Sequence, residues 1–118
     1  MNSFEYKIFN DVYNDMIFGK KNIEFRLLNE KSNSIKVGDE IKFIVLDNKE
    51  KYVLVEVLNK YIYNDIEDLW NHKEVLNNVL NYDKDDFINA FCNIYGKEKV
   101  YNCKIVGIEF KIKSKINS

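Results

Sequence analysis

The stretch GKKNIEFR, residues 19–26, contains the change of hydrophobic period on which the fold depends. Before it, apolar side chains recur at the three- and four-residue spacing of an amphipathic helix: Phe9, Val12, Tyr13, Met16 and Ile17. Gly19 follows as the expected C-terminal cap of this helix. From Ile23 onwards apolar and polar residues alternate through Leu27, which is the two-residue period of a half-buried strand. The sequence therefore predicts a short N-terminal helix that leads into a strand.

Two further strands are predicted after a polar loop over residues 29–34. Gly38-Asp39 is typical of a tight turn, and it precedes a strand over about residues 40–46. A hairpin connection at 47–49 leads into a long strand over 51–61. The short connection favours antiparallel pairing of these two strands.

A helical insert is expected between these strands and the last one. Helices are predicted over 65–72 and 73–80. A third, with Asp83 as its N-cap, carries apolar residues at helical spacing: Phe87, Phe91, Ile94 and Tyr95. The final strand is predicted over residues 100–113. Its apolar phase shifts near Gly107, which predicts a bulge or a sharp bend of the kind found at the corners of small barrels.

The order of these elements predicts the fold class. A helix, three strands, a helical insert and a last strand favour an α+β domain over residues 1–118, built on a small, partly closed antiparallel β-barrel. The N-terminal helix and the insert would flank this barrel. A doubly wound sheet would need strands and helices that alternate regularly, and the sequence lacks that pattern.

Composition and charge exclude several classes of protein. A chain of 118 residues with 46% hydrophobic content can bury a compact core, which argues against disorder. A net charge of −1 argues against binding nucleic acid through charge alone. The chain has no run of eighteen apolar residues and no charged-then-apolar leader, so neither a membrane span nor a secretory signal is expected. Cys92 and Cys103 have no metal-ligand spacing and are expected to be reduced thiols of a cytoplasmic protein.

The single arginine lies within the opening stretch, although the chain has seventeen lysines. The composition indicates a bias that replaces arginine by lysine, so Arg26 suggests a role that needs a planar, forked donor. Glu24 and Arg26 are two residues apart and share one face of the predicted strand. They could face a cleft and bind a ligand, or they could pair with each other or with Asp39 and hold the barrel together.

Three motifs together resemble the ASCH domain (activating-signal-cointegrator homology) of the PUA-like superfamily. They are the G-x-K-x-x-E-x-R pattern at residues 19–26, the v-G-D-x-I-x-F strand at 37–43 and GIEF at 107–110. Each motif alone is weak, but their order and spacing cover nearly the whole chain. The resemblance implies a small β-barrel flanked by helices and a cleft near the first strand. It also implies recognition of RNA, a nucleotide or a modified nucleoside.

The resemblance implies ligand-binding roles for Lys20, Lys21, Glu24, Arg26 and Asp39. The guanidinium of Arg26 would bind a phosphate or a base carbonyl, and Glu24 would accept from a base amino group. The two lysines could instead only complement the helix dipole, and Asp39 could only shape its turn. No cofactor or metal is expected, because the lone histidine, His72, has no partner at ligand spacing.

An enzymatic alternative also follows from the resemblance, since some small ASCH proteins are amidohydrolases that act on acylated cytidine nucleosides. That activity needs a lysine, a hydroxyl nucleophile three residues later and a downstream glutamate. Lys21 matches the lysine, but Glu24 occupies the hydroxyl position, so an amidohydrolase or ribonuclease would have to use Glu24 to activate water. Glu67 and Glu74 are available as the downstream carboxylate, although both are expected on a solvated helical surface.

Tyr61, Tyr63 and Trp70 are expected either to stack on a base or to pack in the core.

Overall fold

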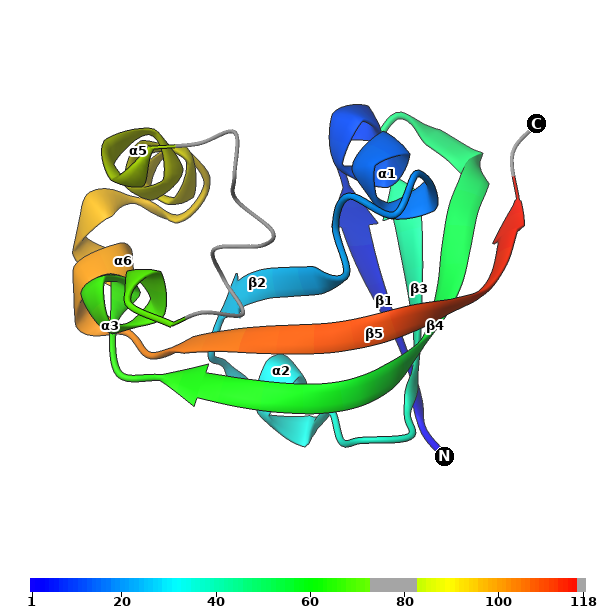
Figure 1. The fold of residues 1–118 in the computed structure, drawn as a ribbon, viewed down its shortest axis with the longest axis horizontal. Coiled ribbons are helices and arrows are strands. Elements are labelled where there is room, and N and C mark those ends of the chain that lie inside the picture. Colours follow the sequence, from blue (N-terminus) through cyan, green and yellow to red (C-terminus); the bar gives the residue numbers. More distant parts are fainter. Residues whose placement is uncertain (73–82, 117–118) are drawn as a thin grey trace.

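The computed structural model describes residues 1–72 and 83–116, whose strands form one five-stranded sheet (Figure 1). The strands are β1 (Ser3–Ile8), β2 (Ile23–Leu27), β3 (Glu40–Val45), β4 (Asn48–Tyr63) and β5 (Ile105–Ile116). The described helices are α1 (Asn10–Ile17), α2 (Glu30–Ser34), α3 (Ile66–Trp70), α5 (Lys84–Tyr95) and α6 (Lys97–Asn102). None of these helices is long and apolar enough to cross a membrane, since the longest has 12 residues.

The sheet curves into a half-barrel with the strand order β1-β3-β4-β5-β2. This confirms the predicted α+β class and the partly closed barrel, with the helical insert before the last strand. The sheet is mixed rather than wholly antiparallel, because β1 pairs in parallel with β3. Strand β1 is absent from the predicted element order, although Phe4, Tyr6 and Ile8 alternate with polar residues. Strands β1 and β2 are the two edges, and the seam between them is the opening of the half-barrel.

The interior is divided into two apolar clusters on opposite faces of the sheet. One fills the half-barrel beneath α1 and includes Tyr13, Phe43 and Phe110. The other lies where α3, α5 and α6 gather at one end of β4 and β5, and it includes Phe25 and Tyr63 (Figure 1). Strand β2 therefore buries its odd-numbered residues against the helices and turns its even-numbered residues toward the seam.

The two clusters explain the phase shift in β5, which is buried on both faces. Val106 and Ile108 pack in the half-barrel, whereas Ile105 packs against the helices. Of the two alternatives predicted at Gly107, a bulge or a sharp bend, the bulge is wrong, because this residue pairs regularly with Phe25 and Tyr61. The irregularities between β4 and β5 lie elsewhere, at 54–55 and 57–59 of β4.

A glycine is required at position 107 because two side chains approach its backbone closely. A Cβ atom at this position would lie 3.1 Å from Cε2 of Tyr63 and 3.2 Å from Cε1 of Phe25. Both rings are buried in the helix-side cluster. A glycine in a strand interior often marks such an approach.

Several helix predictions are confirmed and others need correction. Gly19 follows α1 with φ of 77°, and the Asp83 carboxylate caps α5 by accepting from the backbone N–H of Asp86. Residues 30–34, predicted to be loop, form α2 with an Asn29 capping box. The last strand begins at Ile105 rather than residue 100, because residues 97–102 form α6 and bury Val100. The helix predicted over 73–80 lies outside the described residues.

Candidate functional site

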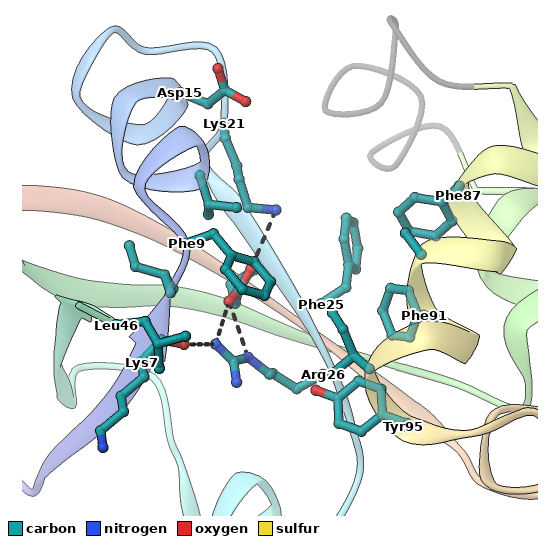
Figure 2. Close-up of a pocket in the computed structure, with 15 residues that line it drawn as sticks. Lys7, Phe9, Asp15, Lys21, Phe25, Arg26, Leu46, Phe87, Phe91 and Tyr95 are labelled. Carbon is teal, nitrogen blue, oxygen red and sulfur yellow. Dashed lines mark hydrogen bonds and ion pairs between the residues drawn. The ribbon is translucent and has the colours of Figure 1, made fainter.

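A pocket of about 270 Å³ lies between the half-barrel and α5 (Figure 2). Residues from β1 and α1 form one wall, residues of β2 form the floor, and α5 forms the opposite wall. Fifteen residues line it: Lys7, Ile8, Phe9, Val12, Asp15, Lys21, Glu24, Phe25, Arg26, Leu46, Phe87, Ala90, Phe91, Ile94 and Tyr95. The pocket is therefore built by residues 7–26, by Leu46 and by residues 87–95, three segments that are distant in the sequence.

The walls of this pocket are apolar and largely aromatic. Figure 2 shows Phe9 and Leu46 on one side and Phe25, Phe87 and Phe91 on the other. Three lining side chains are unusually exposed for large apolar residues: Phe9 at 52%, Leu46 at 53% and Ile94 at 59%. Exposed apolar side chains gathered around a concave site are typical of ligand binding.

A charged cluster lies on the polar side of the pocket, with Glu24 at its centre. The Oε2 atom of Glu24 accepts hydrogen bonds from Arg26 Nε at 3.0 Å and from Arg26 Nη2 at 2.8 Å. The Nζ atom of Lys21 lies 3.4 Å from the other oxygen, Oε1. Glu24 is 7% exposed, so this carboxylate is buried and is compensated by two cations.

Arg26 also crosses the seam of the half-barrel. Its Nη2 atom donates to the backbone carbonyl of Lys7 at 2.9 Å, which joins edge strand β2 to edge strand β1. The guanidinium lies over the ring of Tyr6, 4.5 Å from the ring centroid. Lys31 approaches the same ring and donates to the carbonyl of Glu5 on β1. Arg26 therefore pairs with Glu24 and borders the pocket at the same time.

The pKa values reflect this arrangement. Burial alone would raise the pKa of Glu24, but the charges of Lys21 and Arg26 and their hydrogen bonds outweigh it and hold that pKa below its usual range. Burial would lower the pKa of Arg26, and the Glu24 charge outweighs it and raises that pKa. Burial raises the pKa of Tyr95, whose hydroxyl lies beside Arg26 (Figure 2). Glu24 is thus ionised and Tyr95 neutral at physiological pH.

The other two residues predicted to bind ligand lie apart from the pocket lining. Lys20 is exposed and does not line it. Asp39 is in the turn before β3, where its carboxylate accepts from the backbone N–H groups of Asn2 at 3.0 Å and Lys36 at 2.8 Å. These two backbone hydrogen bonds lower the pKa of Asp39. Both hydrogen bonds of Asp39 are therefore to the backbone rather than to Glu24 or Arg26, and they stabilise the turn.

The remaining sequence candidates take part in packing or surface pairs. Tyr63 is buried and Tyr61 and Trp70 pack against the same helix-side cluster. His72 makes an edge-to-face contact with the ring of Tyr63, and its Nε2 atom lies 3.4 Å from Oδ1 of Asp68. Within residues 1–72 and 83–116, no group of three His, Cys, Asp or Glu side chains could hold a metal ion. Glu67 pairs with Lys84 away from the pocket lining, and Glu74 lies outside the described residues.

Sequence reasoning missed most of the apolar half of the site. Phe9 and Ile94 lie on helical stripes that predicted core positions, yet they border the pocket. Leu46 was assigned to the end of a strand, and nothing in its local sequence marks it. Asp15 and Tyr95 also line the pocket, and neither was predicted to bind a ligand.

No protein-family model and no curated protein matches the chain. Solved structures do. The crystal structure of the hypothetical protein PH0355 is 27% identical, with a TM-score of 0.78 over 93% of this chain and 98% of that chain. The ASCH domain from Lactobacillus crispatus is 14% identical, with a TM-score of 0.65 over 93% and 79% of the two chains. ASCH from Zymomonas mobilis is 11% identical, with a TM-score of 0.64 over 96% and 71%.

The fold is that of an ASCH domain. The likeness to the two ASCH structures extends over nearly all of this chain, which confirms at the level of fold the resemblance carried by the three motifs. The G-x-K-x-x-E-x-R motif at residues 19–26 supplies the charged cluster of the pocket through Lys21, Glu24 and Arg26.

Proposed function

We propose that this ASCH-type chain binds a nucleoside or nucleotide, with the base in the pocket between β2 and α5. The observation that carries the proposal is a donor and an acceptor, Lys21 and Glu24, placed beside aromatic walls. Aromatic side chains can stack on any base. Polar groups that hydrogen-bond to the edge of the base distinguish one base from another. The nucleic-acid association implied by the ASCH resemblance supports the same ligand class.

Pocket size and charge favour a single nucleotide over an extended strand of RNA. A volume of about 270 Å³ is slightly below the range of roughly 300–1,000 Å³ that is typical of sites for drug-sized molecules. The first turn of α5 adds exposed Asp85 and Asp86 near one wall, and the whole chain has a net charge of −1. Those charges oppose the phosphate contacts that dominate RNA affinity. RNA binding would therefore need a base that enters the pocket individually.

The charged residues have different roles in this proposal. Two donor atoms of Arg26 are engaged by Glu24 and by the Lys7 carbonyl. Arg26 therefore positions Glu24. Lys21 Nζ and Glu24 Oε1 make a longer contact of 3.4 Å, so each atom can still hydrogen-bond to a ligand. A base that presents an amino group beside a ring nitrogen or carbonyl would donate to Glu24 and accept from Lys21.

The test compares two adjacent lysines. Binding of a panel of nucleosides and nucleoside monophosphates is measured by calorimetry for the wild type, Lys21→Met and Lys20→Met. We expect Lys21→Met to weaken the tightest ligand by about tenfold or more, since a charge-assisted hydrogen bond contributes roughly 1.5–3 kcal/mol. Lys20→Met removes the same charge outside the pocket and should change affinity less than about twofold. Equal effects of the two substitutions would contradict the assigned site.

The enzymatic alternative has one supporting observation, the contact of Lys21 with a buried carboxylate in the pocket. Two others weigh against it. The lowered pKa of Glu24 makes it a weak base, and Tyr95 carries the one hydroxyl among the described lining residues. Incubation with acylated cytidines and short RNAs, followed by mass analysis, tests this alternative. Turnover that is abolished in Lys21→Ala would establish an amidohydrolase or ribonuclease.

A further inference from the structure

A second hollow adjoins the pocket on the outer surface of β1 and β3. It has a volume of about 400 Å³ and shares Lys7, Leu46 and no other residue with the pocket lining. Its remaining polar lining is Glu5, Lys42 and Lys49. A molecule that fills the aromatic pocket and extends past Leu46 would therefore enter a hollow that contains three lysines.

The parallel pairing of β1 and β3 brings these residues together. Glu5 lies opposite Lys42, and Lys7 lies opposite Ile44. The alternate residues of both strands, such as Tyr6 and Phe43, face the core, so these residues share the outer face of the sheet. Lys49 is at the start of β4, next to the β3–β4 connection.

The lysines of the hollow carry charge that the described protein groups do not neutralise by ion pairing. Within the described part of the chain, none of Lys7, Lys42 and Lys49 forms an ion pair with a carboxylate. By contrast, Lys113 on the same sheet pairs with Glu40 at 3.0 Å. Lys42 is instead held over the ring of Tyr52, 4.3 Å from the centroid, which orders its ammonium group. With Glu5 as the one acidic side chain, the lining has a formal charge of +2.

We propose that this hollow is a phosphate subsite and that the ligand is a nucleoside monophosphate. The inference rests on the proposed function, because the base must occupy the aromatic pocket for its phosphate to reach the lysines. A phosphate monoester carries close to two negative charges and strong acceptor oxygens, which match three ammonium groups opposed by one carboxylate. Lys7 borders both spaces and lies between the base and the phosphate.

The experiment measures affinity for a matched nucleoside, its 5′-monophosphate and a dinucleotide that contains it. Lys42→Gln and Lys49→Gln are the test variants, since neither residue lines the aromatic pocket. Lys97→Gln on α6 removes an exposed lysine that lines neither space and is the control. We expect the monophosphate to bind at least about tenfold tighter than the nucleoside. This preference should fall several-fold in both test variants and at higher salt, because salt screens exposed charges.

The arms distinguish this inference from the function on which it rests. If the nucleoside binds and the monophosphate gains nothing, the phosphate subsite is refuted while the base pocket stands. If the dinucleotide alone shows the lysine-dependent gain, the hollow follows an RNA backbone and the proposal of a mononucleotide is wrong. If Lys97→Gln matches the test variants, the gain is a general charge effect and the subsite is refuted. Failure of every ligand to bind overturns both proposals.

Discussion

Replacing Glu24 by Gln tests whether the buried carboxylate organises the site. The substitution keeps the shape of the side chain and removes the charge that Arg26 and Lys21 neutralise. Removing one partner of a buried ion pair costs about 3–5 kcal/mol. The cost is smaller here because the side chains of Arg26 and Lys21 are 22% and 17% exposed, and the Gln carbonyl can still accept from Arg26. We expect a loss of about 2–3 kcal/mol in the free energy of unfolding.

The assay is thermal unfolding followed by circular dichroism across a range of pH. An unfolding entropy of about 2.1 cal/mol/K per residue gives about 4 °C per kcal/mol for a chain of this length, so Tm should fall by about 8–12 °C at neutral pH. The folded-state pKa of Glu24 is lowered, so its contribution is complete above the unfolded-state pKa of about 4.3. It is lost as the pH falls through the lowered pKa. The Tm difference between wild type and Glu24→Gln should therefore shrink below pH of about 4.

A surface pair provides the matched control. Glu40 forms an ion pair with Lys113 at 3.0 Å, and both side chains are partly exposed. Glu40→Gln should cost less than about 1 kcal/mol, because water solvates both groups when the pair is broken. Equal losses for Glu24→Gln and Glu40→Gln, or a Tm difference that does not depend on pH, would refute the reasoning about the buried carboxylate.

Three further substitutions test the fold and the pocket. Gly107→Ala should lower the free energy of unfolding, measured by chemical denaturation, by about 1–2 kcal/mol, because the new Cβ would press against the packed rings of Tyr63 and Phe25. An unchanged or raised denaturation midpoint would show that these rings move aside without cost. Ala90→Phe should fill the pocket and weaken nucleotide binding more than about tenfold while Tm stays within a few degrees, since Ala90 is an exposed lining residue; retained affinity would place the ligand elsewhere. Arg26→Lys should both lower Tm and weaken nucleotide binding, because a lysine cannot make two bonds to Glu24 and also reach the Lys7 carbonyl on β1. Loss of stability with unchanged affinity would mean that the role of Arg26 is purely structural.

The local part of the fold could be predicted because it is encoded in short-range periodicity. The alternation from Ile23 predicted β2 with the bounds that the structure shows. The helix ending before Gly19 and the Asp83 cap follow from equally local rules. The parallel pairing of β1 with β3 could not be read in this way, because its register depends on tertiary packing. The apolar pattern of β5 led to the wrong prediction of a bulge, because the two apolar clusters contact opposite faces of this one strand.

The candidate site shows the same division. Lys21, Glu24 and Arg26 could be predicted as a group because they lie within one eight-residue motif. Phe9 and Ile94 could not be assigned to the pocket, since a helical stripe does not reveal whether its apolar residues face a core or a cavity. Asp39 was included through its motif, and the hydrogen bonds that it accepts from the backbone N–H groups of Asn2 and Lys36 became visible only in the structure.

The central claim is that the space between β2 and α5 is a nucleobase site. Backbone amide resonances of the labelled protein, followed during titration with the four common nucleoside monophosphates, test it most directly. The account predicts that at least one of them saturates and shifts resonances of residues around Phe9, Lys21 and Phe91. Absence of saturation with all four, or shifts confined to surfaces away from these residues, would contradict it.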